Sequence, residues 1–281
     1  MFKMKTVLFF LIVICSSKID AQYYYKDIVT NVETTLLNQK NKKANVIKLV
    51  VKSYDFDDTE IDNFLCEQEI ENNGKHTITV TGSPFVGENH LHSYYTNQSQ
   101  LTRSVDSNPT LIIQNNYDYT NNKLSKITVT SFETGSKDKT VEVHQWLQND
   151  KQQYYKMYVI KGGTDTTIVQ LKTDSLTNQI NEEIVTYKGK EKDHFYYYYD
   201  ATNNLTDVVQ YNQYKRKLLP LLIFEYDAQQ HITKKTIFTQ GSNDYQMWYY
   251  KYNEKGLKTE EQCYLKGNMF RGKLVYNYKY D

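Results

Sequence analysis

The sequence predicts a mainly β protein: a single elongated antiparallel β-meander sheet, open and twisted, made of hairpin repeats of about 26 residues. Three observations predict this fold class, namely the composition, a recurring turn motif and an alternation of apolar and polar residues. The composition favours strands because 27 tyrosines accompany many threonines, and both residue types suit a half-buried pleated surface. The many Asn and Asp residues favour turns between such strands.

The recurring motif is a tyrosine followed by Asp or Asn, then a short polar stretch, then an apolar residue. Its second residue recurs 27, 26 and 28 residues apart in the C-terminal half, at Asp200, Asp227, Asn253 and Asp281. Weaker copies extend back to Tyr95, so the repeats are clearest over 95–281, and fainter turn signals lie at 71–75 and 41–45. Each repeat is predicted to form one hairpin, which gives about 16 to 18 strands.

Alternation of side chains is clearest near the C-terminus. Leu274, Tyr276 and Tyr278 fall on one face of the predicted strand. Lys273 and Asn277 fall on the other. A period of two with one apolar face predicts a sheet that contacts water on one side only. A sheet this wide must twist, and we expect it to curl over its aromatic face.

The N-terminus has the pattern of a secretory signal peptide, residues 1–21. A short cationic stretch precedes a nearly unbroken apolar run from Val7 to Cys15. This run is about half of the roughly 20 residues that a membrane-spanning helix needs, so no transmembrane segment is expected in the mature chain. We place the cleavage between Ala21 and Gln22. Lipidation at Cys15 is an alternative, although lipoprotein processing favours a small residue before the cysteine.

The signal peptide predicts an extracytoplasmic location, in the periplasm, on the outer surface or outside the cell. Residues 22–281 are predicted to form a single repeat β-sheet domain, because no linker or charge block divides them. At their start, the spacing of Val29, Val32 and Leu36 indicates a short N-terminal helix or an irregular cap. We expect this segment to cover the first edge of the sheet.

The charge balance argues against nucleic acid as a partner. Cleavage leaves 31 basic and 32 acidic residues, without a Lys/Arg stripe that could neutralise phosphates. No polybasic amphipathic segment indicates binding to a membrane surface. Cys66 and Cys263 are the two cysteines that remain, nearly 200 residues apart. The sequence does not decide whether they form a disulfide.

Motifs of catalysis and metal binding are not found in the sequence, so we expect a protein that is not an enzyme and has no cofactor. His90 and His92, with Glu88 in phase on the same strand face, form the nearest approach to a metal site. We interpret them as a solvated polar face. The acidic run at 55–62 lacks the glycine and the final glutamate of an EF-hand loop, so we interpret it as the end of a hairpin.

Two segments carry a resemblance to a known repeat family. Residues 252–259, Tyr-Asn-Glu-Lys-Gly-Leu-Lys-Thr, and residues 226–233 resemble the YD repeats of Rhs-type and teneurin-type proteins. The chain is also similar to exported Bacteroidetes proteins with degenerate copies of this repeat. The resemblance implies a long β-sheet, which Rhs-type proteins wind into a hollow shell around a toxin domain. Because this chain has far fewer repeats and we find no C-terminal toxin, we expect an open sheet without that function.

Two functions compete on this evidence, with an unrecognised hydrolase as a third alternative that would need a deep polar pocket. The first is a non-catalytic extracytoplasmic scaffold that offers a wide surface to a protein partner, as repeat arrays often do. The second is a module that binds glycan or peptidoglycan of the cell envelope through exposed tyrosines, for which the candidates are Tyr196, Tyr197, Tyr198, Tyr199, Tyr249 and Tyr250. The exposure of these rings distinguishes the two, because a glycan reader needs several rings open on one surface.

Overall fold

The computed structural model describes residues 22–83 and 87–281. The predicted signal peptide, residues 1–21, and its alternative lipidation site at Cys15 lie outside the described residues. Within the described residues, no helix is long and apolar enough to cross a membrane.

Eighteen antiparallel strands follow a short N-terminal helical segment, in agreement with the strand number predicted from the repeats. The helical segment consists of a π-helical turn, η1 (Tyr24–Val29), and the helix α1 (Thr30–Lys43). The strands are β1 (Val46–Asp55), β2 (Leu65–Glu71), β3 (His76–Ser83), β4 (Gly87–Tyr95), β5 (Leu101–Ser107), β6 (Leu111–Thr120), β7 (Lys123–Glu133), β8 (Thr140–Gln148), β9 (Tyr154–Lys161), β10 (Asp165–Thr173), β11 (Ile180–Tyr187), β12 (Lys190–Tyr199), β13 (Leu205–Asn212), β14 (Lys217–Tyr226), β15 (Ile232–Phe238), β16 (Tyr245–Tyr252), β17 (Lys258–Leu265) and β18 (Met269–Tyr280).

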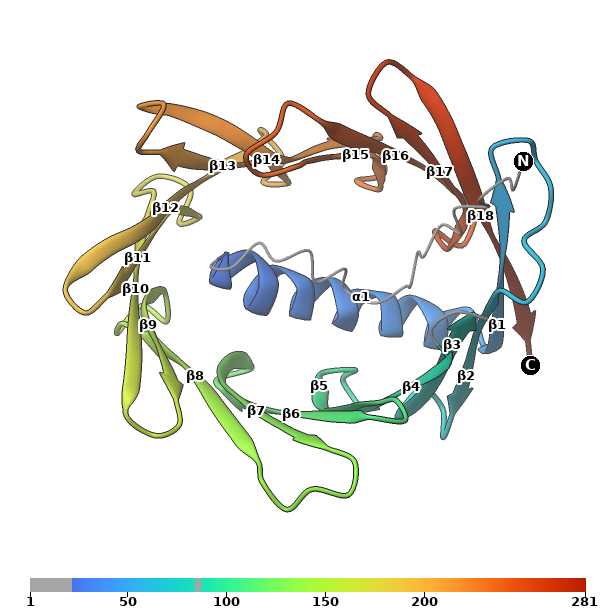
Figure 1. Ribbon diagram of the computed structural model, residues 1–281, viewed down its shortest axis with the longest axis horizontal. Coiled ribbons are helices and arrows are strands. Elements are labelled where there is room, and N and C mark those ends of the chain that lie inside the picture. The colour runs from blue at the N-terminus through green and yellow to red at the C-terminus, as the bar shows by residue number, and fades with distance from the viewer. Residues whose placement is uncertain (1–21, 84–86) are drawn as a thin grey trace, which may run out of the picture.

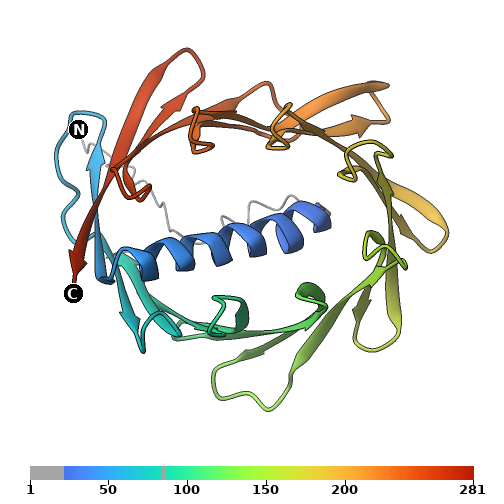
Figure 2. The ribbon, with the colours of Figure 1, turned by 180° about the vertical axis from the view of Figure 1, so that it is seen from behind.

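The sheet closes on itself to form a barrel, so the prediction of an open twisted sheet was wrong. Each strand pairs with its neighbours in the chain, and β1 pairs with β18 as well as with β2, so that Val51 lies opposite Tyr276. Figures 1 and 2 show the resulting ring from its two sides. Closure removes both edges of the sheet and buries the apolar face that an open sheet would leave partly in water.

The repeat motif forms the turns of one rim of the barrel. In the turn from β12 to β13, Asp200 Oδ1 accepts the backbone N–H groups of Thr202 and Asn204, at 2.8 and 3.0 Å. Asn203 adopts φ +66° between them, and the strand register shifts beside Tyr199. The turns that follow Tyr226 and Tyr252 repeat this hydrogen bonding. The motif therefore encodes a tight turn with a β-bulge.

The tyrosine of the motif joins one hairpin to the next. The Tyr226 hydroxyl donates to the carbonyl of Leu205, at 2.7 Å, and the Tyr252 hydroxyl donates to that of Ile232, at 2.8 Å. The motif tyrosines Tyr119 and Tyr199 make the equivalent bond to the hairpin before their own, and Tyr154 and Tyr278, at other positions of the repeat, also donate to a carbonyl of the preceding hairpin. We call this series of hydrogen bonds the tyrosine ladder. Each tyrosine hydroxyl must reach the start of the second strand of the preceding hairpin, so the length of a repeat is coupled to the distance between strands.

The two faces of the wall differ as the alternation predicted. The inner face of β7 to β15 carries the largest cluster of buried apolar side chains, including Trp146, Met157 and Phe195. The outer face carries ion pairs between neighbouring strands, such as Lys172 with Glu182 and Lys234 with Glu225, both at 2.7 Å. The predicted division into an apolar and a polar face is confirmed, and the apolar face points inward.

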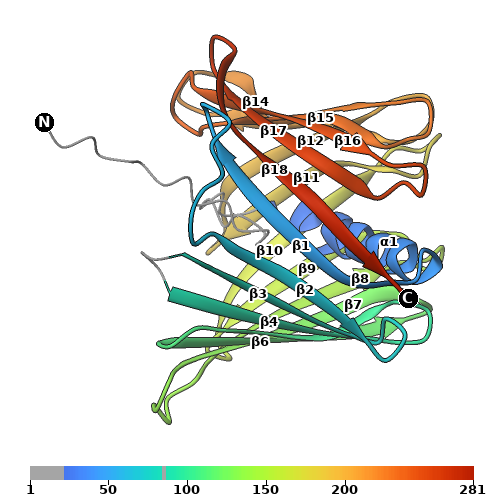
Figure 3. The ribbon, with the colours of Figure 1, turned by 90° about the vertical axis from the view of Figure 1, so that its right-hand side faces the viewer.

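The N-terminal helical segment lies inside the ring and does not cover an edge (Figures 1 and 3). A short helix was predicted here, but its expected role was wrong, because closure leaves no edge to cover. The turn signal at 41–45 marks the end of α1 and the start of β1, so it does not continue the hairpin series. The signal at 71–75 is a hairpin turn, between β2 and β3.

Cys66 and Cys263, the two cysteines among the described residues, are free and buried. Cys66 is on β2 and Cys263 on β17, and the chain closure puts only β1 and β18 between those strands. Three strand spacings still separate the thiols by roughly 14 Å or more, beyond the reach of a disulfide. Burial raises the pKa of each thiol to about 12, so both are neutral packing groups.

Candidate binding cavity inside the barrel

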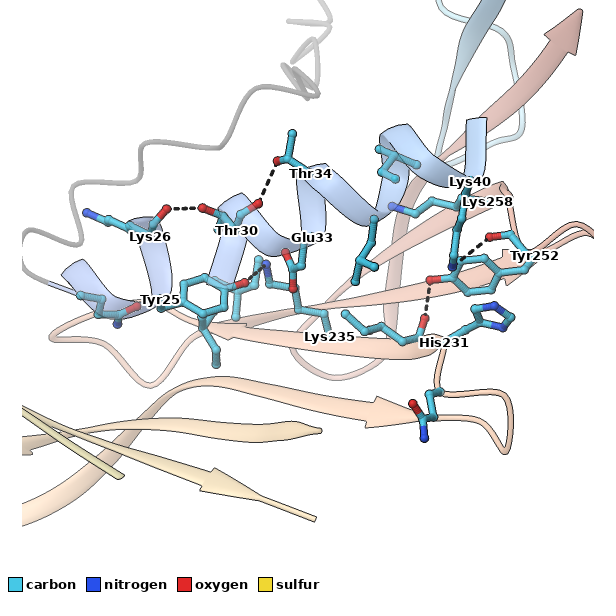
Figure 4. A pocket seen from close by; sticks show the side chains of 18 residues that line it. Tyr25, Lys26, Thr30, Glu33, Thr34, Lys40, His231, Lys235, Tyr252 and Lys258 are labelled. Atoms are coloured by element: carbon cyan, nitrogen blue, oxygen red, sulfur yellow. Dashed lines mark hydrogen bonds between the residues drawn. The ribbon is translucent and has the colours of Figure 1, made fainter. Parts of the chain in front are cut away.

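A cavity of about 520 Å³ lies between α1 and the part of the wall formed by β14 to β17 (Figure 4). This volume falls in the range of small-molecule sites. The helix contributes Thr30, Glu33, Leu36, Leu37 and Lys40. The wall contributes Leu222, Ile232, Lys235, Ile237, Tyr252 and Lys258. One end of the cavity reaches the rim, where turn residues Gln230 and Gly256 line it.

One face of α1 is fixed to the wall by polar contacts. The Asn31 side chain donates to the Tyr119 hydroxyl and the Asn38 side chain donates to the carbonyl of Gly74, both at 3.0 Å. Near the end of the helix, Lys42 donates to the carbonyl of Asn97, at 3.1 Å. These partners lie on β6 and in hairpin turns of the rim that carries the repeat motif.

The opposite face of α1 is turned toward the cavity. Leu36 and Leu37 are 51% and 50% exposed, although they lie on a helix surrounded by the barrel. Apolar side chains are normally buried, so such exposure inside a ring of strands indicates a face without an apolar partner. The helix is thus amphipathic, but its polar face, with the asparagines, contacts the wall, and its apolar face, with the leucines, faces the cavity.

The turn η1, which precedes α1, is anchored by a buried carboxylate. Glu183 on β11 is fully buried and accepts the backbone N–H groups of Tyr23 and Tyr24, at 2.9 and 3.0 Å, and the Tyr197 hydroxyl, at 2.6 Å. Burial raises the pKa of Glu183 to about 7, against the lowering effect of these hydrogen bonds. Tyr24 packs edge-on against Tyr197, with their centroids 5.2 Å apart, so apolar contact reinforces the anchor.

A second buried polar group holds the same turn. His144 Nδ1 lies 2.6 Å from Asp27 Oδ2, His144 Nε2 lies 2.7 Å from Glu142, and Trp146 donates to Asp27 at 3.2 Å. Burial lowers the pKa of His144, but the two carboxylates outweigh it and raise the pKa to about 9. With both ring nitrogens engaged by carboxylates, the imidazolium has none left for proton transfer or a metal. This cluster is structural.

Cationic side chains outnumber acidic ones in the cavity lining: Lys26, Lys40, Lys235 and Lys258 face the single carboxylate of Glu33. Figure 4 shows Glu33, Lys235 and Tyr25 gathered between the helix and the wall. The surrounding wall desolvates Glu33 and raises its pKa, while Lys235 and Lys258 act in the opposite direction. The lining therefore favours negative charge.

The contacts of the cationic side chains differ. Lys235 donates to the Tyr25 hydroxyl at 3.3 Å, and Lys258 pairs with Glu261 on the same strand. Lys40 Nζ lies 3.4 Å from the carbonyl of Gly256, and no carboxylate of the described residues lies within 4 Å of it.

The six tyrosines proposed from the sequence do not gather on one surface. Tyr197, Tyr199 and Tyr250 point into the barrel, where Tyr197 is fully buried against η1. Tyr196, Tyr198 and Tyr249 alternate with them and face outward. Tyr198 and Tyr249 are 46% and 38% exposed, but β13, β14 and β15 separate their strands. Glycan binding through these residues stays a prediction.

The histidines singled out earlier do not assemble a metal site. His90 approaches Glu88 at 3.4 Å, whereas His92 contacts His76, at 3.2 Å between ring nitrogens. Among the residues described by the structure, no three His, Cys, Asp or Glu side chains are arranged to hold a metal ion. The acidic run at 55–62 lies in and around the loop from β1 to β2, where Glu60 pairs with Lys52.

Sequence reasoning missed the cavity residues. The spacing of Val32 and Leu36 predicted the helix, but not which of its faces would line a cavity. Lys235 was not singled out, although alternation along β15 sends Lys234 outward and Lys235 inward. Lys235 lies two residues before Ile237 on the same strand, and this spacing was the signal that could have placed it on the inner face.

Comparison with known proteins does not assign this chain to a family. No family model matches the sequence, and no curated protein matches it. The resemblance to YD-repeat proteins therefore stays a prediction.

Solved structures give only weak similarity. A porin-like protein from Bacteroides uniformis has a TM-score of 0.39 and 10% identity, over 83% of this chain and 98% of that one. TcdB2-TccC3 has a TM-score of 0.32 and 9% identity, over 82% of this chain and 16% of that one. Since both TM-scores are below 0.5, neither similarity carries an argument about function.

Proposed function

We propose that this is a non-catalytic, extracytoplasmic protein whose mature chain, residues 22–281, forms one domain that binds a small molecule inside its barrel. The observation that carries this proposal is the cavity of about 520 Å³ against which α1 turns its exposed Leu36 and Leu37. An apolar helix face inside a closed wall has no stabilising role while it contacts only water. It gains one when a ligand covers it.

The proposal narrows the predicted scaffold function. Much of the apolar inner face packs against η1 and within the wall, so that part is not available to a large protein partner. What remains inside is a cavity of small-molecule size. The extracytoplasmic location rests on the signal peptide predicted from residues 1–21.

Binding of a neutral fluorescent probe tests the proposal. Phenylnaphthylamine becomes fluorescent in apolar sites, and we expect saturable binding of one equivalent to the mature chain. Leu37→Trp projects a larger side chain into the cavity and should weaken that binding. Val32→Trp is the matched control, because Val32 is 51% exposed on the same helix but is not part of the cavity lining. Unsaturable binding, or equal binding by both variants, would overturn the proposal.

A further inference from the structure

Resting on the function proposed above, we propose that the ligand is an amphipathic organic anion, with its charged head at Lys40, at the rim end of the cavity, and its apolar body along Leu36 and Leu37. Both halves of this assignment follow from side chains that line the same cavity. The proposal names a chemical class, of which a fatty carboxylate is the simplest member.

The apolar half of the site is built from two opposed surfaces. Leu36 and Leu37 project from the helix, and Ile232 and Ile237 line the cavity from β15. A chain of methylene groups between these surfaces would remove apolar area from water on both sides, at about 25 cal/mol per Å². A sugar would leave this area without a matching partner.

The charged half lies beside the leucines on the same helix. Lys40 follows Leu36 by one turn of α1, so its ammonium group lies next to the apolar stripe. Its closest polar partner is a carbonyl oxygen, that of Gly256, at 3.4 Å. A carboxylate head can therefore bind Lys40 without displacing an existing ion pair.

The wall supplies a second cation, Lys235, at the other end of the cavity, beside Tyr25 (Figure 4). Lys235 Nζ lies 5.7 Å from the Tyr25 ring centroid and 5.5 Å from that of Phe224, so it is held over aromatic faces. Inside the cavity, the carboxylate of Glu33 competes with a ligand for Lys235. Glu261 forms an ion pair with Lys258. A cationic ligand would meet four lysines and is therefore disfavoured.

Gly256 keeps the rim end of the site open. It adopts φ +69°, and a Cβ atom there would lie 2.9 Å from His231 Nε2 and 3.7 Å from Lys40 Nζ. A side chain at this position would clash with the imidazole of His231 and would reach van der Waals contact with the ammonium group of Lys40. The imidazole is itself fixed by stacking on Tyr252, with centroids 4.7 Å apart, so it has little freedom to move aside.

Displacement of phenylnaphthylamine by three probes of equal chain length tests the ligand class: dodecanoate, dodecanol and dodecyltrimethylammonium, each below its micelle concentration. We expect dodecanoate to displace the dye at a concentration about tenfold lower than dodecanol, which corresponds to about 1.4 kcal/mol. The cationic probe should be the weakest. If dodecanol competes as well as dodecanoate, the preference for an anion is overturned while the cavity function stands.

Lysine variants locate the head. Lys40→Met should remove most of the preference for dodecanoate over dodecanol and leave dye binding intact. Lys234→Met is the control and should keep the preference, because Lys234 faces outward and pairs with Glu225. Unchanged preference in Lys40→Met, with folding confirmed by circular dichroism, would overturn the assignment. Failure of the dye itself to bind would instead overturn the proposed function.

Discussion

The two parts of the N-terminal segment are held in the barrel in opposite ways. In η1, Tyr24, Tyr25 and Ile28 are buried in the main apolar cluster, and Glu183 accepts hydrogen bonds from the backbone that precedes them. In α1, the buried residues are Asn31, Asn38 and Asn41, and the leucines face the cavity.

This difference separates stability from function. Apolar burial and satisfied hydrogen bonds fix η1, so changes there should cost free energy of unfolding. The open face of α1 contributes little to folding, so it can be kept for a ligand. The same segment thus acts as an anchor at its start and as one wall of a binding site along its length.

The largest effect should come from the anchor carboxylate. Glu183→Ala leaves two backbone N–H groups and one hydroxyl without an acceptor, and we expect a loss of about 4 kcal/mol, since each unsatisfied buried donor costs about 1 to 3 kcal/mol. Urea unfolding followed by tryptophan fluorescence measures it. Glu182→Ala, one residue away on the outer face, removes only surface ion pairs with Lys172 and His194 and should cost less than about 1 kcal/mol. Similar losses of stability in both variants would contradict the role of Glu183 as the anchor of η1.

The comparison of the two parts can be made directly with matched truncations. Ile28→Ala removes buried methyl groups and should lower the free energy of unfolding by about 2 kcal/mol. Leu37→Ala should change it by less than about 0.5 kcal/mol, because that side chain is half exposed to the cavity. If Leu37→Ala costs as much as Ile28→Ala, the helix face is packed and the cavity is not open.

Stability should fall as the pH rises, because both buried titratable groups of the anchor have raised pKa values. The contribution of Glu183 is fully present below its ordinary pKa of 4.5 and is lost as the pH approaches about 7. That of His144 is fully present below 6.5 and is lost as the pH approaches about 9. Melting temperatures between pH 5 and pH 9 measure the decline. In Glu183→Gln, the part of the decline in melting temperature that occurs below about pH 7 should vanish. An unchanged profile would show that this part of the decline does not come from Glu183.

The smallest effect concerns the tyrosine ladder of the wall. Tyr226→Phe removes the hydrogen bond to the Leu205 carbonyl and should cost about 1 kcal/mol. Tyr249→Phe is its control, since that hydroxyl faces outward and has only a 3.9 Å contact to the Met247 sulfur. Urea unfolding of the two variants gives the difference. Equal values would mean that the repeated tyrosine is kept for packing alone.

Local features of this barrel could be predicted from the sequence because their physical causes are local. Alternation around Leu274 and Tyr276 identified the inner face, and the turn motif at Asp200 and Asp227 marked the hairpins. Turn chemistry and side-chain period involve residues a few positions apart, so one segment of sequence contains the information. The helical spacing near Val32 is likewise a local feature that could be predicted from the sequence.

Closure, the place of the helix and the cavity were decided by the tertiary structure. Closure depends on the pairing of β1 with β18, whose residues Val51 and Tyr276 lie 225 positions apart. Nothing near either residue specifies that partner, since any edge strand offers the same backbone groups. The helical segment then packs inside because the closed wall presents Glu183 and His144 to η1, and Tyr119 and the Gly74 carbonyl to α1. Which of its faces docks is set by those long-range partners, and this choice left Leu36 and Leu37 open beside Lys40 and Lys235.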